Sequence, residues 1–184
     1  VGIACTALLI SFVSYEYGIE SGNPNRDKMV WVMQNLPSDP GNKVAYMHSG
    51  IPEQLMDKYT EVEDFLQLNS FDIKHIEVNN QYFEPIDIIN VNASFTKFFP
   101  FELQYGTWET LNDPQSIIIT ENQAYRLFGN DDALGKQISV FQDDWGVEIM
   151  RTYTVGGVAK TRSQSAITFD GLICNPESNW GGPT

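Results

Sequence analysis

The sequence predicts an α+β domain in which short strands outnumber helices. Short runs rich in Ile, Val, Phe and Tyr recur between turn-forming residues, which is typical of strands. Only a few segments carry helical signals, and they follow no repeating strand–helix order, so a β-α-β-α architecture is not expected. The chain has 184 residues, a length typical of one domain.

Composition and charge exclude several classes of protein. Hydrophobic residues make up 42% of the chain, which excludes a largely disordered or collagen-like protein. The chain carries 11 basic and 24 acidic residues, for a net charge of −13 at pH 7. A surface of this charge repels phosphate backbones, so no nucleic-acid partner is expected.

Residues 1–14 are predicted to form the end of a transmembrane helix. The run from residue 1 to 13 carries no charge, and the tyrosines at 15 and 17 suit the edge of a membrane. A helix over this run rises only ~20 Å, less than the ~30 Å hydrocarbon layer. The basic residues that begin a signal peptide are missing here. A lipoprotein anchor cysteine would follow the apolar run, whereas Cys5 precedes most of it. A core helix of a soluble protein stays open as the alternative.

The next expected elements are a strand, a helix and a strand. A run of Met, Val and Trp predicts a strand over 29–33. Pro52 and Glu53 predict the start of a helix, because proline suits a first turn and an acidic side chain stabilises the N-terminal end. Apolar residues then predict a strand over 62–68.

The middle of the chain has mostly β character. Residues 70–91 predict two or three short strands, separated at Asn79 and Asn80. Residues 93–99 carry three phenylalanines and predict a short helix or helical turn. The apolar run 117–119 predicts a short, fully buried strand.

The signals for a helix boundary are clearest after this strand. Thr120 is expected to cap a helix, and Gln123 completes the pattern of a capping box. The helix should run to Phe128 and end at Gly129. A bulge is expected at 156–157. The remaining strands are expected within 135–140, 147–158 and 169–174.

We expect no catalytic residues, no cofactor-binding residues and no metal ligands, and therefore no enzyme. His48 and His75 lack metal-ligand spacing to each other or to other ligand-type residues. The loop 129–135 has one residue too many between its glycines for a phosphate loop, and Gln137 replaces the expected Ser or Thr. Residues 94–97 match Ser-x-x-Lys, but the companion Lys-Thr-Gly is missing.

Several segments resemble the MacB-like periplasmic core domain of FtsX-like ABC-transporter permeases. Residues 116–138 read as an apolar strand, a Thr-Glu pair, a helix ending in Leu-Phe-Gly, and then Gly-Lys, as in that family. Residues 153–159 match its Val-x-Gly-Val strand, with Gly-Gly-Val here. Further similar segments lie at 2–4, 52–63 and 91–101, although Asn92 stands where the family usually has Asp.

The resemblance implies a specific arrangement of the fold. After the end of the transmembrane helix, residues 15–184 would form the extracytoplasmic core domain. A porter-like α/β layer would hold a strand over 28–36, a helix over 52–60 and a strand over 62–69, and the strand near 169–174 would return to it. Residues 70–166 would form an inserted, mostly-β subdomain.

The resemblance also implies a function without chemistry of its own. The chain would be the extracytoplasmic domain of a permease subunit in the bacterial inner membrane, facing the periplasm. It would couple cytoplasmic ATP hydrolysis to export, lipoprotein handling or a periplasmic partner. The implied partners are the membrane, an ABC ATPase, a second permease subunit, and a periplasmic membrane-fusion or lipoprotein partner. The alternative is a secreted or anchored ligand-binding, adhesion or sensor domain, with a hydrolase as the weaker option.

Overall fold

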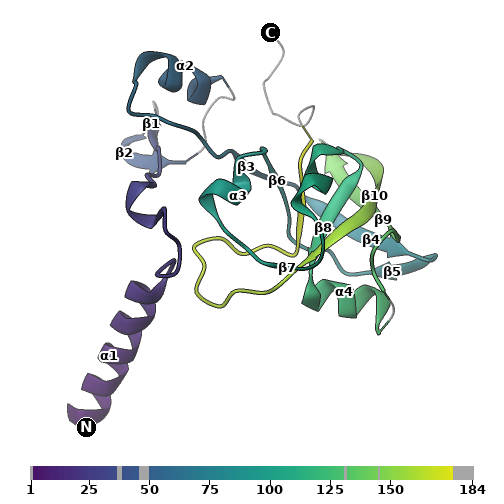
Figure 1. The fold of residues 1–184 in the computed structure, drawn as a ribbon, viewed down its shortest axis with the longest axis horizontal. Helices are drawn as coiled ribbons and strands as arrows, with labels where there is room; N and C mark the ends of the chain where they lie inside the picture. Colours follow the sequence, from purple (N-terminus) through teal and green to yellow (C-terminus); the bar gives the residue numbers. More distant parts are fainter. Residues whose placement is uncertain (1, 37–38, 46–49, 131, 145, 176–184) are drawn as a thin grey trace.

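Most strands of the molecule belong to one mixed sheet, and a long helix, α1 (Gly2–Gly18), projects away from it (Figure 1). The sheet and the short separate helices confirm the predicted α+β fold class. The structure is a computed structural model that describes residues 2–36, 39–45, 50–130, 132–144 and 146–175.

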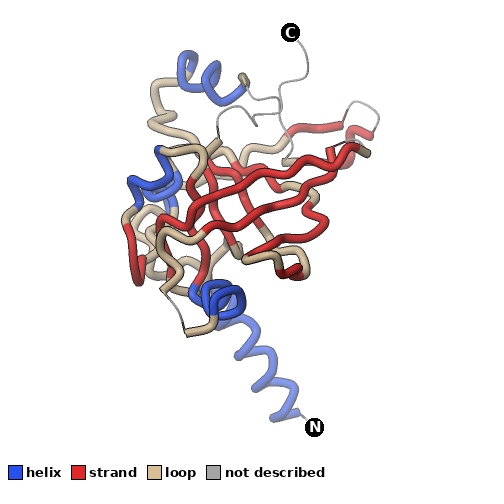
Figure 2. Tube along the Cα trace, turned by 90° about the vertical axis from the view of Figure 1, so that its right-hand side faces the viewer, coloured by secondary structure: helices blue, strands red, loops and turns tan. Residues whose placement is uncertain are grey.

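The sheet holds nine strands in the described part of the chain, and β10 (Val147–Ala159) is its central member. The first half of β10 pairs antiparallel with β9 (Gln137–Asp144), and its second half pairs parallel with β8 (Ser116–Thr120). The strands therefore cross the molecule as one curved surface (Figure 2). The other members are β3 (Leu68–Ser70), β4 (Ile73–Val78), β5 (Gln81–Phe83), β6 (Ile88–Val91), β7 (Leu103–Gly106) and β11 (Gly171–Ile173).

The bulge expected in the long strand is present. The pairing of β10 with β8 shifts by one residue between Val155 and Gly157, which leaves Gly156 as the extra residue. β7 pairs with β10 at the same place, and Gly106 has a φ of 82° there. A side chain on Gly106 would collide with the main chain of Gly156, so glycine allows the close approach of these strands.

Apolar side chains pack on both faces of the sheet. β8 shows this most clearly, because all five of its residues are buried. Ile117 and Ile119 face a first core cluster that includes Ile76 and Val140, whereas Ile118 faces a second. The second core cluster contains four buried phenylalanines. Its buried members are Val91, Phe95, Phe99, Phe101, Leu111, Ile118, Ala159, Ile167, Phe169 and Leu172.

Each face is covered by a short helix. α4 (Glu121–Phe128) packs Ala124, Leu127 and Phe128 against the first core cluster. α3 (Phe95–Phe98) places Phe95 at the centre of the second core cluster, fully buried. The predicted helical turn at 93–99 is therefore confirmed.

The cap of α4 is only half of the predicted capping box. The Thr120 hydroxyl accepts a hydrogen bond from the Gln123 main-chain N–H at 3.4 Å, and the helix ends at Gly129 with a φ of 66°. The reciprocal bond is absent from the described structure because Asp170 replaces it. The Asp170 main-chain oxygen accepts from the Thr120 N–H, and its carboxylate accepts from the Gln123 side chain, both at 2.9 Å.

The predicted strand over 28–36 is wrong over most of its length. Only β1 (Gln34–Leu36) forms there, and it pairs with β2 (Asp39–Val44) in a separate two-stranded sheet. Val30 and Trp31 are 83% and 65% exposed. An apolar run becomes a strand only when a neighbouring strand accepts its main-chain hydrogen bonds, and the described residues place none beside 30–33.

The strand expected over 62–69 is also much shorter, because side chains, rather than a neighbouring strand, form hydrogen bonds with its main-chain groups. Asp64 accepts a hydrogen bond from the Phe65 N–H at 2.8 Å. The Asn92 side chain binds the Phe65 oxygen at 3.0 Å and the Gln67 N–H at 3.4 Å. Regular pairing begins only at β3, at the end of the sheet. The helix predicted at 52–60 is present as α2 (Ile51–Lys58).

α1 coincides with the segment predicted to be the end of a transmembrane helix. No helix among the described residues has the length and apolarity needed to span a bilayer. The sheet also includes β3 and β11, which lie outside the predicted insertion 70–166, and this division of the domain stays a prediction.

Candidate functional site

A buried carboxylate joins the end of α1 to the β core. Glu20 lies two residues after the helix and is only 3% exposed. One of its oxygens accepts hydrogen bonds from the Ser165 hydroxyl at 2.6 Å and the Ala166 N–H at 2.9 Å. The other accepts from the Asn23 side chain at 3.1 Å and lies 3.6 Å from the Arg162 guanidinium. We call Glu20, Asn23, Arg162 and Ser165 the α1 joint.

Main-chain contacts hold the same segment in place. The Glu20 N–H donates to the Gln164 oxygen at 3.0 Å, and its φ is 55°. A positive φ at a residue other than glycine persists only where surrounding contacts enforce it. The Asn23 side chain also donates to the Phe98 oxygen at 2.6 Å, which links the joint to α3. The chain leaving α1 is thus bound to two separate parts of the core.

The joint is ionic as well as hydrogen-bonded. Burial alone would raise the pKa of Glu20, but hydrogen bonds from Ser165, Ala166 and Asn23 and the charge of Arg162 outweigh it and lower the pKa. The carboxylate is therefore ionised at neutral pH. The Arg162 guanidinium lies over the Phe101 ring, 5.3 Å from its centre, so the joint contacts the second core cluster directly.

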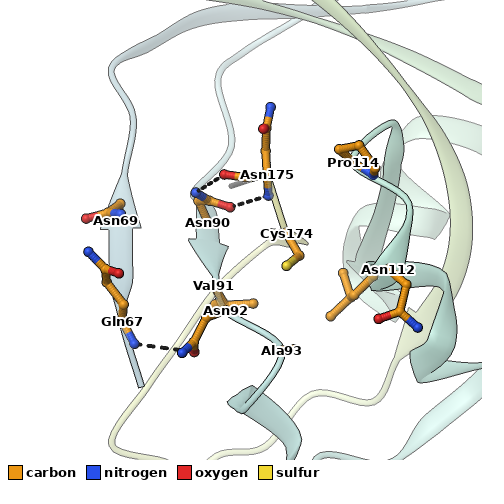
Figure 3. A pocket seen from close by; sticks show the side chains of 11 residues that line it. Gln67, Asn69, Asn90, Val91, Asn92, Ala93, Asn112, Pro114, Cys174 and Asn175 are labelled. Atoms are coloured by element: carbon orange, nitrogen blue, oxygen red, sulfur yellow. Dashed lines mark hydrogen bonds between the residues drawn. The ribbon is translucent and has the colours of Figure 1, made fainter. Parts of the chain in front are cut away.

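A second feature is a cavity of about 330 Å³ beside β3, β6 and the end of β11 (Figure 3). Carboxamide side chains dominate its polar lining, and we call it the amide pocket. Its one titratable lining group is Cys174, and burial raises the pKa of this thiol. The pocket therefore presents no ionised side chain at neutral pH. The carboxamides are Gln67, Asn69, Asn90, Asn92, Asn112 and Asn175.

Two of these carboxamides bind main chain. The Asn90 side chain donates to the Asn175 oxygen at 3.0 Å and accepts from the Asn175 N–H at 2.8 Å, and both residues are buried. Asn92 binds an oxygen and an N–H of residues 65 and 67 in the same two-sided way. Both side chains therefore act as a peptide group of a neighbouring strand would.

The sequence patterns that were weighed as sites have structural roles or lie elsewhere. Ser94 and Lys97 both bind the Asp64 carboxylate, at 2.8 Å and 2.7 Å, while Phe95 between them points into the core. The His75 ring stacks on Phe141 with 4.2 Å between ring centres. His48 lies outside the described residues. No group of three or more His, Cys, Asp or Glu residues in the described ranges is arranged to hold a metal ion.

Sequence patterns alone did not predict the α1 joint or the amide pocket. Apart from Asn23, the partners of Glu20 lie about 145 positions away in the chain, so no local spacing connects them. The pocket gathers single Asn and Gln residues from four segments, each of which is common in turns and loops.

Comparison with known proteins gives a consistent result. The family model of the MacB-like periplasmic core domain matches residues 1–177. Among solved structures, a domain described as part of a permease protein from Porphyromonas gingivalis is 21% identical, with a TM-score of 0.59. The match covers 75% of this chain, which spans only 58% of that domain. This likeness shows a shared fold.

Two weaker structural matches have related descriptions. The periplasmic region of MacB from Actinobacillus actinomycetemcomitans is 15% identical, with a TM-score of 0.49, over 77% of this chain and 62% of that one. The extracellular domain of the ABC-type transporter YknZ from Gram-positive bacteria is 18% identical, with a TM-score of 0.41, over 59% and 54%. No curated protein sequence matches significantly. The family match extends over nearly the whole chain, and the protein therefore belongs to the MacB-like periplasmic core domain family.

Proposed function

We propose that this chain is the non-catalytic extracytoplasmic domain of an ABC-transporter permease, in which the α1 joint passes movement between a membrane helix and the β core. The family supports the location on the periplasmic side of the inner membrane. The observation that carries the coupling role is the buried carboxylate of Glu20, which ties the end of α1 to the core through its contacts with Ser165, Ala166 and Arg162.

The properties of α1 suit a helix that continues into lipid. Ile10, Phe12 and Val13 are 61%, 62% and 46% exposed, and water is a poor solvent for such side chains. Tyr15 and Tyr17 are exposed near the end of the helix, as expected for side chains at a membrane–water interface. Movement of such a helix reaches the core through the last turn of α1 and the segment that follows it.

The joint is built to transmit force rather than absorb it. A flexible linker would let α1 move without effect on the core. Here the linking segment is short and bound on both sides, by residues 162–166 and by α3. Breaking it would leave a buried carboxylate and a partly buried guanidinium without their partners, which is costly.

The energy for such movement has to come from another protein domain. We propose a cytoplasmic ABC ATPase as the source, and a second permease subunit as a partner in the membrane. A periplasmic membrane-fusion protein or lipoprotein is the proposed partner outside the membrane. Export or lipoprotein handling would be the result of the cycle. A secreted or anchored ligand-binding domain is the alternative, and it predicts no response to ATP.

The test compares Glu20→Gln with Glu16→Gln in the full-length membrane protein, purified with its ATPase and reconstituted in nanodiscs. Glu16 is exposed on α1, one turn earlier, and serves as the matched control. We expect ATP to change hydrogen exchange across residues 162–166 in the native protein and in the control. In Glu20→Gln this change should disappear while ATP hydrolysis continues.

Two results would contradict the proposal. One is an equal response of both variants to ATP, which would show that the joint does not carry the movement. The other is the absence of any ATPase that copurifies with the protein and of any ATP-dependent change, which would favour the anchored ligand-binding alternative.

A further inference from the structure

The chemistry of the amide pocket restricts what it can bind. Its lining contains no ionised side chain, so it offers no counter-ion for a phosphate, a carboxylate or an amine. A purely apolar ligand, such as an acyl chain, would leave the carboxamides without hydrogen-bond partners. The ligand that fits is uncharged and carries both donors and acceptors.

The pocket already binds polypeptide main chain in two places. Asn90 holds the N–H and oxygen of Asn175, and Asn92 holds an oxygen and an N–H of the segment before β3. A carboxamide carries its donor and acceptor in one plane, like the peptide group, so it can replace a strand neighbour. The geometry of the occupied carboxamides thus indicates which chemistry the others would recognise.

Three further carboxamides remain available at the mouth of the pocket. Within the described part of the chain, the side chains of Gln67, Asn69 and Asn112 make no hydrogen bond, and none of them is buried. Gln67 and Asn69 come from the β3 side and Asn112 from the opposite side, with Cys174 between them (Figure 3).

Two features of the surroundings favour an extended chain. β3 is the end strand of the sheet, and among the described strands only β6 pairs with it, so a segment that crosses the pocket from Asn112 to Gln67 and Asn69 meets no further described strand beyond β3. Between the carboxamides, Val91, Leu111 and Ala93 give the pocket an apolar floor. Such a floor suits one aliphatic side chain of a bound segment.

We infer that the amide pocket binds an uncharged, extended segment of a partner polypeptide, whose main-chain amides pair with Gln67, Asn69 and Asn112. The aliphatic side chain of one residue in that segment lies on the floor formed by Val91 and Leu111. This binding is separate from the coupling role, because no residue of the α1 joint lines the pocket.

The test is an NMR titration of the ¹⁵N-labelled 184-residue chain, kept in a mild detergent that covers the apolar side chains of α1. The probe is an acetylated, amidated pentapeptide of alternating threonine and valine. The same peptide with glutamate at its centre and the neutral sugar maltotriose are the comparison ligands. We expect the pentapeptide to shift the side-chain NH₂ signals of Gln67, Asn69 and Asn112, and the other two ligands to leave them in place.

Substitutions then locate the binding. Asn69→Asp keeps the shape of the side chain but replaces donors with a charge, and we expect at least about tenfold weaker peptide binding. Asn112→Asp, at the exposed end of the 3-10 helix Trp108–Asn112 on the other side, should act in the same direction and guards against a folding defect in the first variant. Asn122→Asp is the matched control, because Asn122 is exposed on α4 and does not line the pocket.

The inference is overturned if the pentapeptide leaves the three carboxamide signals unchanged. It is also overturned if maltotriose or the glutamate peptide shifts them equally, since the pocket would then not select uncharged main chain. Equal peptide affinity of the native chain and both folded pocket variants would have the same meaning.

Discussion

The β core and the N-terminal region, residues 2–58, are stabilised in different ways. Among the described side chains of α1, β1, β2 and α2, none is buried. In the core, by contrast, β8 is buried along its whole length and α3 and α4 each place apolar side chains on the sheet. The hydrogen bonds between the two regions centre on the carboxylate of Glu20 and the carboxamide of Asn23, while Met29 packs against the second core cluster.

The two kinds of contact have different effects: apolar burial stabilises the core, whereas the polar contacts connect α1 to it. Apolar burial has no direction and stabilises the core cooperatively. The polar contacts of the α1 joint contribute less energy, but they fix the position of the chain that leaves the helix. The core should therefore fold without the N-terminal region, while the connection between them should depend on a few side chains.

The largest expected effect comes from the aromatic centre of the core. Phe95 is fully buried and lies within about 6 Å, centre to centre, of the rings of Phe99, Phe101, Trp108 and Phe169. Phe95→Ala should reduce the free energy of unfolding by about 3–5 kcal/mol, measured by denaturant titration.

The matched variant in the N-terminal region is Trp31→Ala. Trp31 is 65% exposed, so its truncation should change the free energy of unfolding by less than about 0.5 kcal/mol. Similar losses of unfolding free energy in the two variants would contradict this distinction between the regions, because the run near Trp31 would then belong to the core.

A smaller effect is expected at the joint, and it depends on pH. Glu20 has a folded-state pKa below its ordinary value of 4.5, so the stability it contributes is present above that pH and is lost as the pH falls through the folded-state pKa. Glu20→Gln should cost about 1.5–3 kcal/mol at pH 7, the range for hydrogen bonds to a charged group.

The measurement is the difference in unfolding free energy between the native chain and Glu20→Gln, recorded from pH 7 to pH 3. The difference should shrink below pH 4.5. Glu16→Gln, at an exposed position, should stay close to the native chain throughout. A constant difference at every pH would show that the charge of Glu20 is not what stabilises the joint.

The sequence predicted best where local signals and tertiary structure agree. Thr120 caps α4, Gly129 ends it, and the apolar run before it forms β8, because each of these features is decided within a few residues. The bulge at Gly156 was also predictable, since paired glycines in a long strand are typical of one.

The failures have one physical cause. The run at 30–33 is as apolar as the strands of the core, but no described strand lies beside it, and apolarity does not reveal the pairing partner. In the same way, Asp170 takes the bonds expected for the capping box, and Asn92 takes those expected for a strand before Leu68. Contacts between distant residues decide these details, and so they also decide the joint and the pocket.

The smallest expected effect on the core comes from deleting residues 1–14. The described contacts of α1 with the core begin beyond the cut: the Tyr15 hydroxyl lies 3.5 Å from the Ser163 oxygen, and Glu20 follows. The free energy of unfolding should therefore change by less than about 0.5 kcal/mol. Removal of exposed apolar side chains such as Ile10 and Phe12 should also convert the protein to a monomer without detergent, measured by light scattering.

A longer deletion, of residues 1–25, sharpens this comparison because it also removes Glu20 and Asn23. Residues 162–166 then lose their contacts with Tyr15 and Glu20, and this loop should exchange its amide hydrogens faster while the sheet stays protected. If the shorter deletion already unfolds the sheet, residues 1–14 are part of the core, and the apolar exposure of α1 is no sign of a membrane helix. If neither deletion affects the loop, the polar contacts of Glu20 do not hold it, and transmission would have to follow another route from α1 to the core.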